Sequence, residues 1–146
     1  MKKKEQLCIV ALVGSLRRES YTRRVVNALR ELAPEAMAIE IAPIGSLPLY
    51  NEDDETDGPP SAWQAFRNQV RGGDAVLFAT PEYNRSIPGV LKNAIDVGSR
   101  PNGASVWSGK PAAVLSASLG SLGGFGANHH LRQCLTFLDM PVLQQP

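Results

Sequence analysis

The sequence has almost no excess charge, few cysteines and no long hydrophobic run. Its 146 residues include fifteen Lys plus Arg and fourteen Asp plus Glu, for a net charge of +1. A nearly neutral chain offers no broad basic surface for nucleic acid or anionic lipid. The longest apolar run, Leu7 to Val13, is too short to cross a bilayer. We therefore expect no nucleic-acid partner and no membrane span.

Only two cysteines are present, Cys8 in an apolar strand pattern and Cys134 in a helical one. These settings favour two buried thiols over a disulfide or a metal pair, and a cytoplasmic location follows as the default. The basic start, Lys2 to Lys4, is typical of a signal peptide, but a Gly-Ser-Leu-Arg-Arg stretch follows the apolar run where a cleavage site of small residues would lie. We interpret these lysines as a solvated tail.

The pattern of hydrophobic residues predicts a parallel sheet covered by helices, built as one domain over residues 1–146. Short apolar runs alternate with longer segments of helical period. The expected strands are 7–13, 38–41, 75–79, 112–116 and one beginning near Pro141. The first expected helix is 20–32, with Val25, Val26 and Leu29 buried. A second starts near 59–61 and ends at 72–73, a third follows Pro88, and a fourth runs from about 127 to 138. The first, third and fourth strands are apolar throughout, which indicates central strands.

The chain stops at Pro146, before any helix could follow the last expected strand. In a doubly wound sheet that helix would share a face with the first helix, so part of the apolar sheet would face water without it. We therefore expect the chain to be a C-terminally truncated version of a longer protein.

An acidic stretch, Asn51 to Glu55, precedes the second expected helix. It lacks a nearby histidine and an ordered ligand spacing, so a solvated loop is favoured over a metal site. No metal ligand is assigned.

Polar and glycine-rich residues follow three of the expected strands, where open α/β sheets bind ligands. Gly14 to Arg23 joins the first strand to the first helix, and its hydroxyls, Arg17 and the free amides of the helix start suit a monophosphate. Neither the G-x-G-x-x-G spacing nor a P-loop is present. The alternative is an ordinary capped helix with exposed arginines.

The other two loops suit a flat ring. Thr80 to Gly89 has polar, aromatic and backbone groups that can contact the edge and face of a heterocycle. The alternative for this segment is a plain turn that begins at a proline. Ser116 to Gly124 has glycines that permit close approach of the backbone to a ligand. The alternative for this segment is a flexible surface loop.

Together these motifs resemble the NADPH-dependent FMN reductase family, a flavodoxin-like group that includes quinone, chromate and azo-dye reductases. The resemblance runs from Gly14-Ser15-Leu16-Arg17 through Pro81-Glu82-Tyr83-Asn84 and the segment 89–96 to His130-Leu131-Arg132. It implies an α/β fold with a flavodoxin-like, doubly wound, five-stranded parallel sheet of order 2-1-3-4-5 and FMN at its carboxyl edge.

The resemblance also implies the residues that hold FMN. It implies that the FMN phosphate is bound by Ser15, Arg17, Ser20 and Thr22. It implies that the isoalloxazine and ribityl groups are contacted by Pro81, Glu82, Tyr83, Asn84 and Arg85. The other side of the flavin site is then closed by Ser116, Gly120 and Gly123. The chain departs from the family at Gly126, where many members have Arg, and at Val97, where Trp is common.

The implied activity is electron transfer from NADPH or NADH through FMN to quinones, azo compounds or metal oxyanions such as chromate. Because the cofactor supplies this chemistry, no catalytic acid or base is assigned. We interpret His129 and His130 as packing or interface residues. The family implies a homodimer or homotetramer. The alternatives are a flavodoxin-like electron carrier, which is usually strongly acidic, and a non-catalytic flavin- or nucleotide-binding module.

Overall fold

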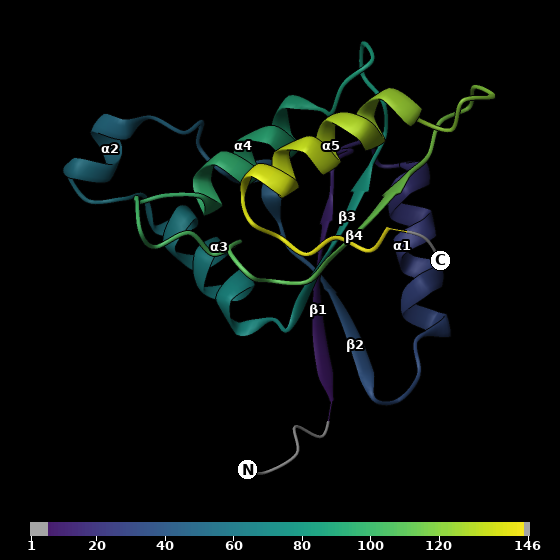
Figure 1. The fold of residues 1–146 in the computed structure, drawn as a ribbon, viewed down its shortest axis with the longest axis horizontal. Coiled ribbons are helices and arrows are strands. Elements are labelled where there is room, and N and C mark those ends of the chain that lie inside the picture. The colour runs from purple at the N-terminus through teal and green to yellow at the C-terminus, as the bar shows by residue number, and fades with distance from the viewer. Residues whose placement is uncertain (1–5, 145–146) are drawn as a thin grey trace.

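The computed structural model describes residues 6–144, which alternate strands and helices along the chain (Figure 1). The strands are β1 (Leu7–Val13), β2 (Met37–Ile41), β3 (Ala75–Thr80) and β4 (Ala112–Ser116). The helices are α1 (Tyr21–Leu32), α2 (Glu52–Thr56), α3 (Ser61–Gly72), α4 (Gly89–Gly98) and α5 (Phe125–Phe137), with a 3-10 turn, η1, at Ile44–Ser46. The predicted lysine tail lies outside the described residues.

The sheet is parallel, and its strand order is β2-β1-β3-β4, which confirms the predicted order as far as the fourth strand. The expected fifth strand is reduced to one parallel bridge between Ala112 and Val142. The Ala112 amide donates to Pro141 O, and the Leu143 amide donates to Ala112 O, both at 2.9 Å. The sheet therefore has four strands in the described part of the chain. The prediction that the fourth strand is central was wrong, because its outer edge carries only this bridge.

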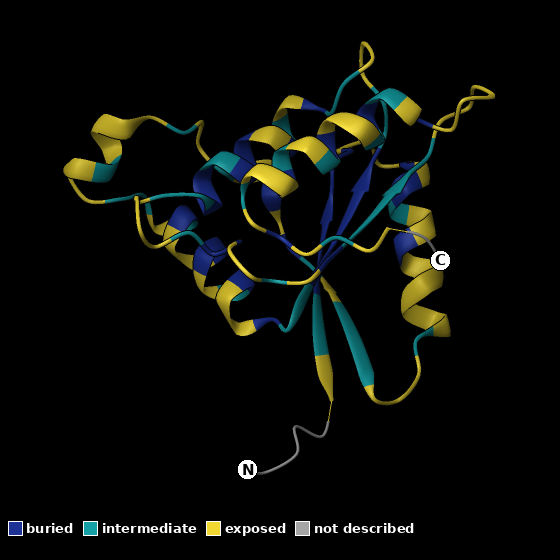
Figure 2. Ribbon diagram, in the orientation of Figure 1, coloured by how far each residue is buried: buried dark blue, intermediate teal, exposed yellow. Residues whose placement is uncertain are grey.

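The two faces of the sheet are covered unequally (Figures 1 and 2). Helix α1 lies alone on one face, whereas α3, α4 and α5 lie on the other. The larger cluster is on the three-helix side and surrounds Trp63, Phe78 and Trp107, none of which is exposed. The α1 side has only a small cluster of buried residues, made by Ala11, Val13, Val26, Leu77 and Ala79.

The predicted buried stripe of α1 is narrower than expected. Val26 is buried, but Val25 and Leu29 are 40% and 37% exposed. Thr22 and Val26, four residues apart, are the buried positions of this helix. A single helix touches a sheet along one line, so side chains on its flanks stay in contact with water unless a second helix packs beside them.

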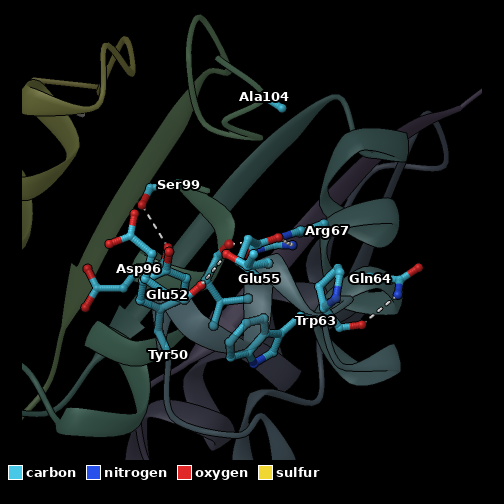
Figure 3. A network of polar contacts seen from close by, with 12 residues as sticks. Tyr50, Glu52, Glu55, Trp63, Gln64, Arg67, Asp96, Ser99 and Ala104 are labelled. Carbon is cyan, nitrogen blue, oxygen red and sulfur yellow. Dashed lines mark hydrogen bonds and ion pairs between the residues drawn. The ribbon is translucent and has the colours of Figure 1, made fainter. Parts of the chain in front are cut away.

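The acidic stretch is a short helix rather than the solvated loop that the sequence favoured. Asn51 caps α2, and its side chain accepts from the Asp53 amide at 3.2 Å. Glu55 receives two hydrogen bonds from Arg67 of α3, at 2.8 and 2.7 Å (Figure 3). Arg67 is 3% exposed and also donates from Nε to Val97 O at 2.8 Å. The pattern of acidic residues did not predict that Glu55 would pair with the buried guanidinium of Arg67 from the next helix.

Candidate functional site

The register of the sheet brings the ends of three strands to one level. Val13 pairs with Ala79, and Thr80 pairs with Ser116. The amide of Gly14 donates to Ala79 O at 2.8 Å, and the amide of Ala117 donates to Thr80 O at 3.1 Å. The loops after β1, β3 and β4 therefore leave the sheet side by side at its carboxyl edge, the place that the sequence predicted for a ligand.

Gly14 allows the first two of these loops to approach closely. A Cβ atom at this position would lie 3.2 Å from Leu91 Cδ2 and 3.3 Å from Pro81 Cδ. Both distances are tighter than ordinary van der Waals contact, so glycine keeps the loop after β1 against the loop after β3.

The loop after β1 places hydroxyl groups at the start of α1. Ser15, Ser20 and Thr22 are 4%, 2% and 1% exposed. Ser20 is the N-cap residue, and its Oγ accepts from the Arg23 amide at 3.1 Å and lies 3.0 Å from Thr22 Oγ1. The first turn of α1 has no acidic residue. A helix start has amides without intrahelical acceptors and a positive dipole end, so this loop is suited to an anion.

Arg17 is exposed beside these hydroxyls. Its guanidinium lies over the Tyr21 ring, 5.9 Å from the ring centre. Its amide donates to Ser15 Oγ at 3.4 Å. The side chain can therefore reach an anion from the solvent side of the loop.

The loop after β3 contains a tight turn. Tyr83 and Ser86 exchange two backbone hydrogen bonds, at 2.9 and 3.0 Å. Between them, Asn84 has a φ of 51° and Arg85 a φ of 63°. Two successive left-handed residues define a type I′ turn, which fixes the backbone of this loop. The Tyr83 side chain is 46% exposed, so one aromatic ring is available at the site.

Glu82 connects this loop to α5. Its Oε2 accepts from the Ala127 amide at 3.1 Å, and its Oε1 accepts from Arg85 at 3.2 Å. The Ala127 hydrogen bond, with smaller contributions from the Gly126 amide and Arg85, lowers the pKa of Glu82. The contact with α5 was not predicted from the sequence. The role that the resemblance gives Glu82 in holding the ring remains a prediction.

The structure gives a reason for glycine at position 126, where the chain departs from the family that its sequence resembles. A Cβ atom there would lie 2.8 Å from Arg85 O and 3.0 Å from Glu82 Oε2. A larger side chain would have to displace the backbone of the type I′ turn.

The loop after β4 completes the edge. Ser116 Oγ accepts from Asn128 Nδ2 at 3.2 Å, and Asn128 Oδ1 accepts from Arg132 Nε at 2.9 Å. Gly120 is exposed, and Gly123 and Gly124 have φ values of 58° and 81°. These two glycines begin α5 from a left-handed backbone that other residues rarely adopt.

Sequence reasoning missed Asn128 and the role of His130. His130 Nδ1 lies 2.9 Å from Ser86 Oγ, so α5 meets the end of the β3 loop a second time. His129 lies against the Phe125 ring at 4.4 Å, and both histidines are exposed. For the hydrogen bond between Asn128 and Arg132, the available signal in the sequence was their spacing of four residues on one helix.

The fold and this edge together define a class of protein. It is an open, parallel α/β sheet with a phosphate-compatible helix start at the end of β1. Exposed apolar side chains, Leu16, Tyr83, Leu119 and Leu122, lie on the three loops beside it. This combination suits a flat aromatic ligand that carries one phosphate, as FMN does. Across residues 6–144, no group of three or more His, Cys, Asp and Glu side chains is placed to hold a metal ion.

Comparison with known proteins agrees with this class. The model of the NADPH-dependent FMN reductase family matches residues 7–146. The chain belongs to that family.

Similar proteins are known from several bacteria. The chain is 64% identical over 138 residues to a quinone reductase of Pseudomonas putida, covering 94% of this chain and 74% of that one. It is 47% identical over 140 residues to a 2-hydroxy-1,4-benzoquinone reductase of Burkholderia sp., covering 96% and 76%. The solved structure of the flavoenzyme NAD(P)H:(acceptor) oxidoreductase from Paracoccus denitrificans superposes with a TM-score of 0.91 at 38% identity, covering 96% and 76%.

Proposed function

We propose that this protein is an NAD(P)H-dependent, FMN-containing quinone reductase. The observation that carries the proposal is the acid-free start of α1, where the buried hydroxyls of Ser15, Ser20 and Thr22 gather at the carboxyl edge of the sheet. Membership of the FMN reductase family supports the same cofactor, and two relatives named as quinone reductases support the acceptor class.

The proposal assigns each loop one part of FMN. Ser15, Arg17, Ser20 and Thr22 hold the phosphate through hydroxyls, the helix start and a guanidinium. The turn formed by Pro81, Glu82, Tyr83, Asn84 and Arg85 holds the isoalloxazine and ribityl groups, and Ser116, Gly120 and Gly123 close the other side. Bound FMN supplies hydride acceptance and electron transfer.

The chain itself orients the ring and leaves one face open. The bonds between Tyr83 and Ser86 hold the turn backbone, and the bond from Ala127 to Glu82 holds the turn against α5. No side chain is assigned as a general acid or base. An open face that admits a nicotinamide and then an acceptor also suits azo compounds and chromate, which we propose as further acceptors.

We also propose a homodimer or homotetramer in the cytoplasm. A hollow of about 770 Å³ lies between α4 and α5, beside the ligand edge rather than over it, and its lining includes Phe137, which is 89% exposed. Such an exposed apolar surface favours packing against a second copy. A monomer mass in solution at working concentration would contradict this part of the proposal.

Cys8 and Cys134 are half-buried and form no disulfide, which is compatible with a reducing compartment. Residues 6–144 contain no helix long and apolar enough to span a membrane.

The test is the visible spectrum of the purified protein reconstituted with FMN under anaerobic conditions. We expect NADPH or NADH to bleach the flavin and a quinone to restore its colour. Bound flavin that no nicotinamide bleaches would indicate an electron carrier instead, and failure to retain FMN would contradict the assigned phosphate site.

A Ser20→Ala variant tests the phosphate site directly. Loss of the cap and of one hydroxyl should weaken FMN binding and lower stability by about 1 kcal/mol. Ser61→Ala is the matched control, because Ser61 is an exposed serine at the start of α3.

A further inference from the structure

A second hollow lies beside the phosphate loop, between α1 and the segment that follows β2. Its volume is about 510 Å³. Apolar side chains from the loop after β1 and from the end of β2 line it, among them Leu16, Ile41 and Ile44. Three polar residues of α1 line the same hollow: Arg23, Asn27 and Arg30. The hollow is within the size range of sites that bind small molecules.

The three polar residues share one face of α1. Their spacing of four and three residues places them one above another along the helix. Within the described part of the chain, neither the Arg23 nor the Arg30 guanidinium has a hydrogen bond or ion pair partner, whereas Arg24 on the next face pairs with Glu19. No carboxylate lines this hollow. Two cations in a hollow that no carboxylate lines attract a negatively charged group.

The hollow adjoins the proposed flavin site through Leu16. This residue belongs to the loop that carries Ser15 and Arg17, and it also lines the hollow. The 3-10 turn after β2 packs tightly against it, since a Cβ atom at Gly45 would lie 2.8 Å from Leu16 Cδ2. A ligand in the hollow would therefore lie next to the loop that we assign to the FMN phosphate, at the carboxyl ends of β1 and β2.

We propose that this hollow binds the adenosine 2′-phosphate end of NADPH. The apolar side chains provide a surface for the adenine ring, Asn27 provides an amide for hydrogen bonding, and Arg23 and Arg30 bind the 2′-phosphate. NADH lacks that phosphate, so the two arginines favour NADPH. The inference rests on the proposed function and adds to it a site that decides which nicotinamide is preferred.

The first test measures steady-state reduction of a quinone by the FMN-loaded enzyme with each nicotinamide. Arg23→Ala and Arg30→Ala should each raise the KM for NADPH roughly ten-fold or more, because each removes a charge-assisted hydrogen bond, and should leave the KM for NADH nearly unchanged. Arg24→Ala is the control, because it removes the same charge from the neighbouring face of α1. Equal effects from Arg24→Ala, or equal effects on NADH, would show general electrostatic attraction and overturn the proposal.

The second test does not depend on activity. Titration calorimetry with adenosine 2′,5′-bisphosphate should show binding to the FMN-loaded protein, much weaker binding of adenosine 5′-monophosphate, and loss of the difference in the Arg23→Ala and Arg30→Ala variants. Arg23→Gln and Arg30→Gln replace any alanine variant that does not fold. Bisphosphate binding that survives all four substitutions would overturn the proposal.

The two experiments separate this inference from the function on which it rests. An enzyme that reduces quinones equally well with NADH and NADPH, and whose arginine variants behave like the parent, remains a quinone reductase without this site. A protein that oxidises neither nicotinamide is not the proposed enzyme, whatever the calorimetry shows.

Discussion

The carboxylate of Glu82 accepts a hydrogen bond from the amide of Ala127 at 3.1 Å, across 45 positions of sequence. One residue in the loop after β3 thereby contacts the first turn of α5. The Ala127 amide, the start of a helix and the Arg85 guanidinium all favour the charged form of this carboxylate, and its pKa lies below the ordinary value of 4.5.

The pKa of Glu82 predicts how this connection depends on pH. A carboxylate whose pKa is lower in the folded state than in the unfolded state stabilises the fold fully above the unfolded pKa, and the stabilisation is lost as pH falls through the folded pKa. Glu82→Gln should therefore lower the free energy of unfolding at about pH 7, and should lower it less at about pH 3, where the carboxylate of the unfolded chain is protonated. Urea denaturation at the two pH values measures this, with exposed Glu35→Gln as the control. A difference between variant and parent that is the same at both pH values would contradict the prediction.

The type I′ turn predicts unequal effects on stability for two substitutions at Asn84. Its φ of 51° is accessible to asparagine and glycine but strained for a β-branched residue. Asn84→Val should destabilise the protein by about 1–2 kcal/mol, and Asn84→Gly by less than about 0.5 kcal/mol. Chemical denaturation of the flavin-free protein measures both. Equal losses for the two variants would mean that the Asn84 side chain, not the backbone conformation, stabilises the turn.

The ion pair between Glu55 and Arg67 predicts a large loss when one partner is removed. Arg67 is almost completely buried, so Glu55→Gln leaves its charge without a counter-ion, and we expect a loss of about 3 kcal/mol. The exposed pair Lys92 and Asp96 on α4 is the control, because Asp96→Asn should cost less than about 1 kcal/mol. The double variant Glu55→Leu, Arg67→Met should recover most of the loss, and no recovery would contradict the interpretation as an unpaired charge.

Three of the four strands were predictable because each is an almost unbroken apolar run between polar loops, whereas Glu40 interrupts the run in β2. The run Leu7 to Val13 corresponds to β1, and Ala112 to Ser116 corresponds to β4. The cap Ser20 and the prolines before α3 and α4 correctly marked where helices begin. Local residue chemistry decides these features, so a single sequence carries the information.

What the sequence did not reveal depends on contacts between distant segments. Short helix α2 has five residues and no apolar face, so it has no periodicity to detect. Its Glu55 is ordered by Arg67, and Glu82 is ordered by Ala127. The exposure of Val25 and Leu29 likewise depends on how much of the sheet α1 covers alone. The residues assigned to FMN lie on three adjoining loops, but their contacts with the cofactor remain predictions.

The type I′ turn also has a consequence for how a ligand is received. Its backbone conformation is set by Asn84 and Arg85 before any ring arrives, so binding there restricts few further torsion angles. The glycine-rich loop after β4 has the opposite character, since Gly120 and Gly123 leave its torsion angles freer. Adjustment to a bound ring should therefore be concentrated in that loop, and amide hydrogen exchange should slow there far more than in the turn.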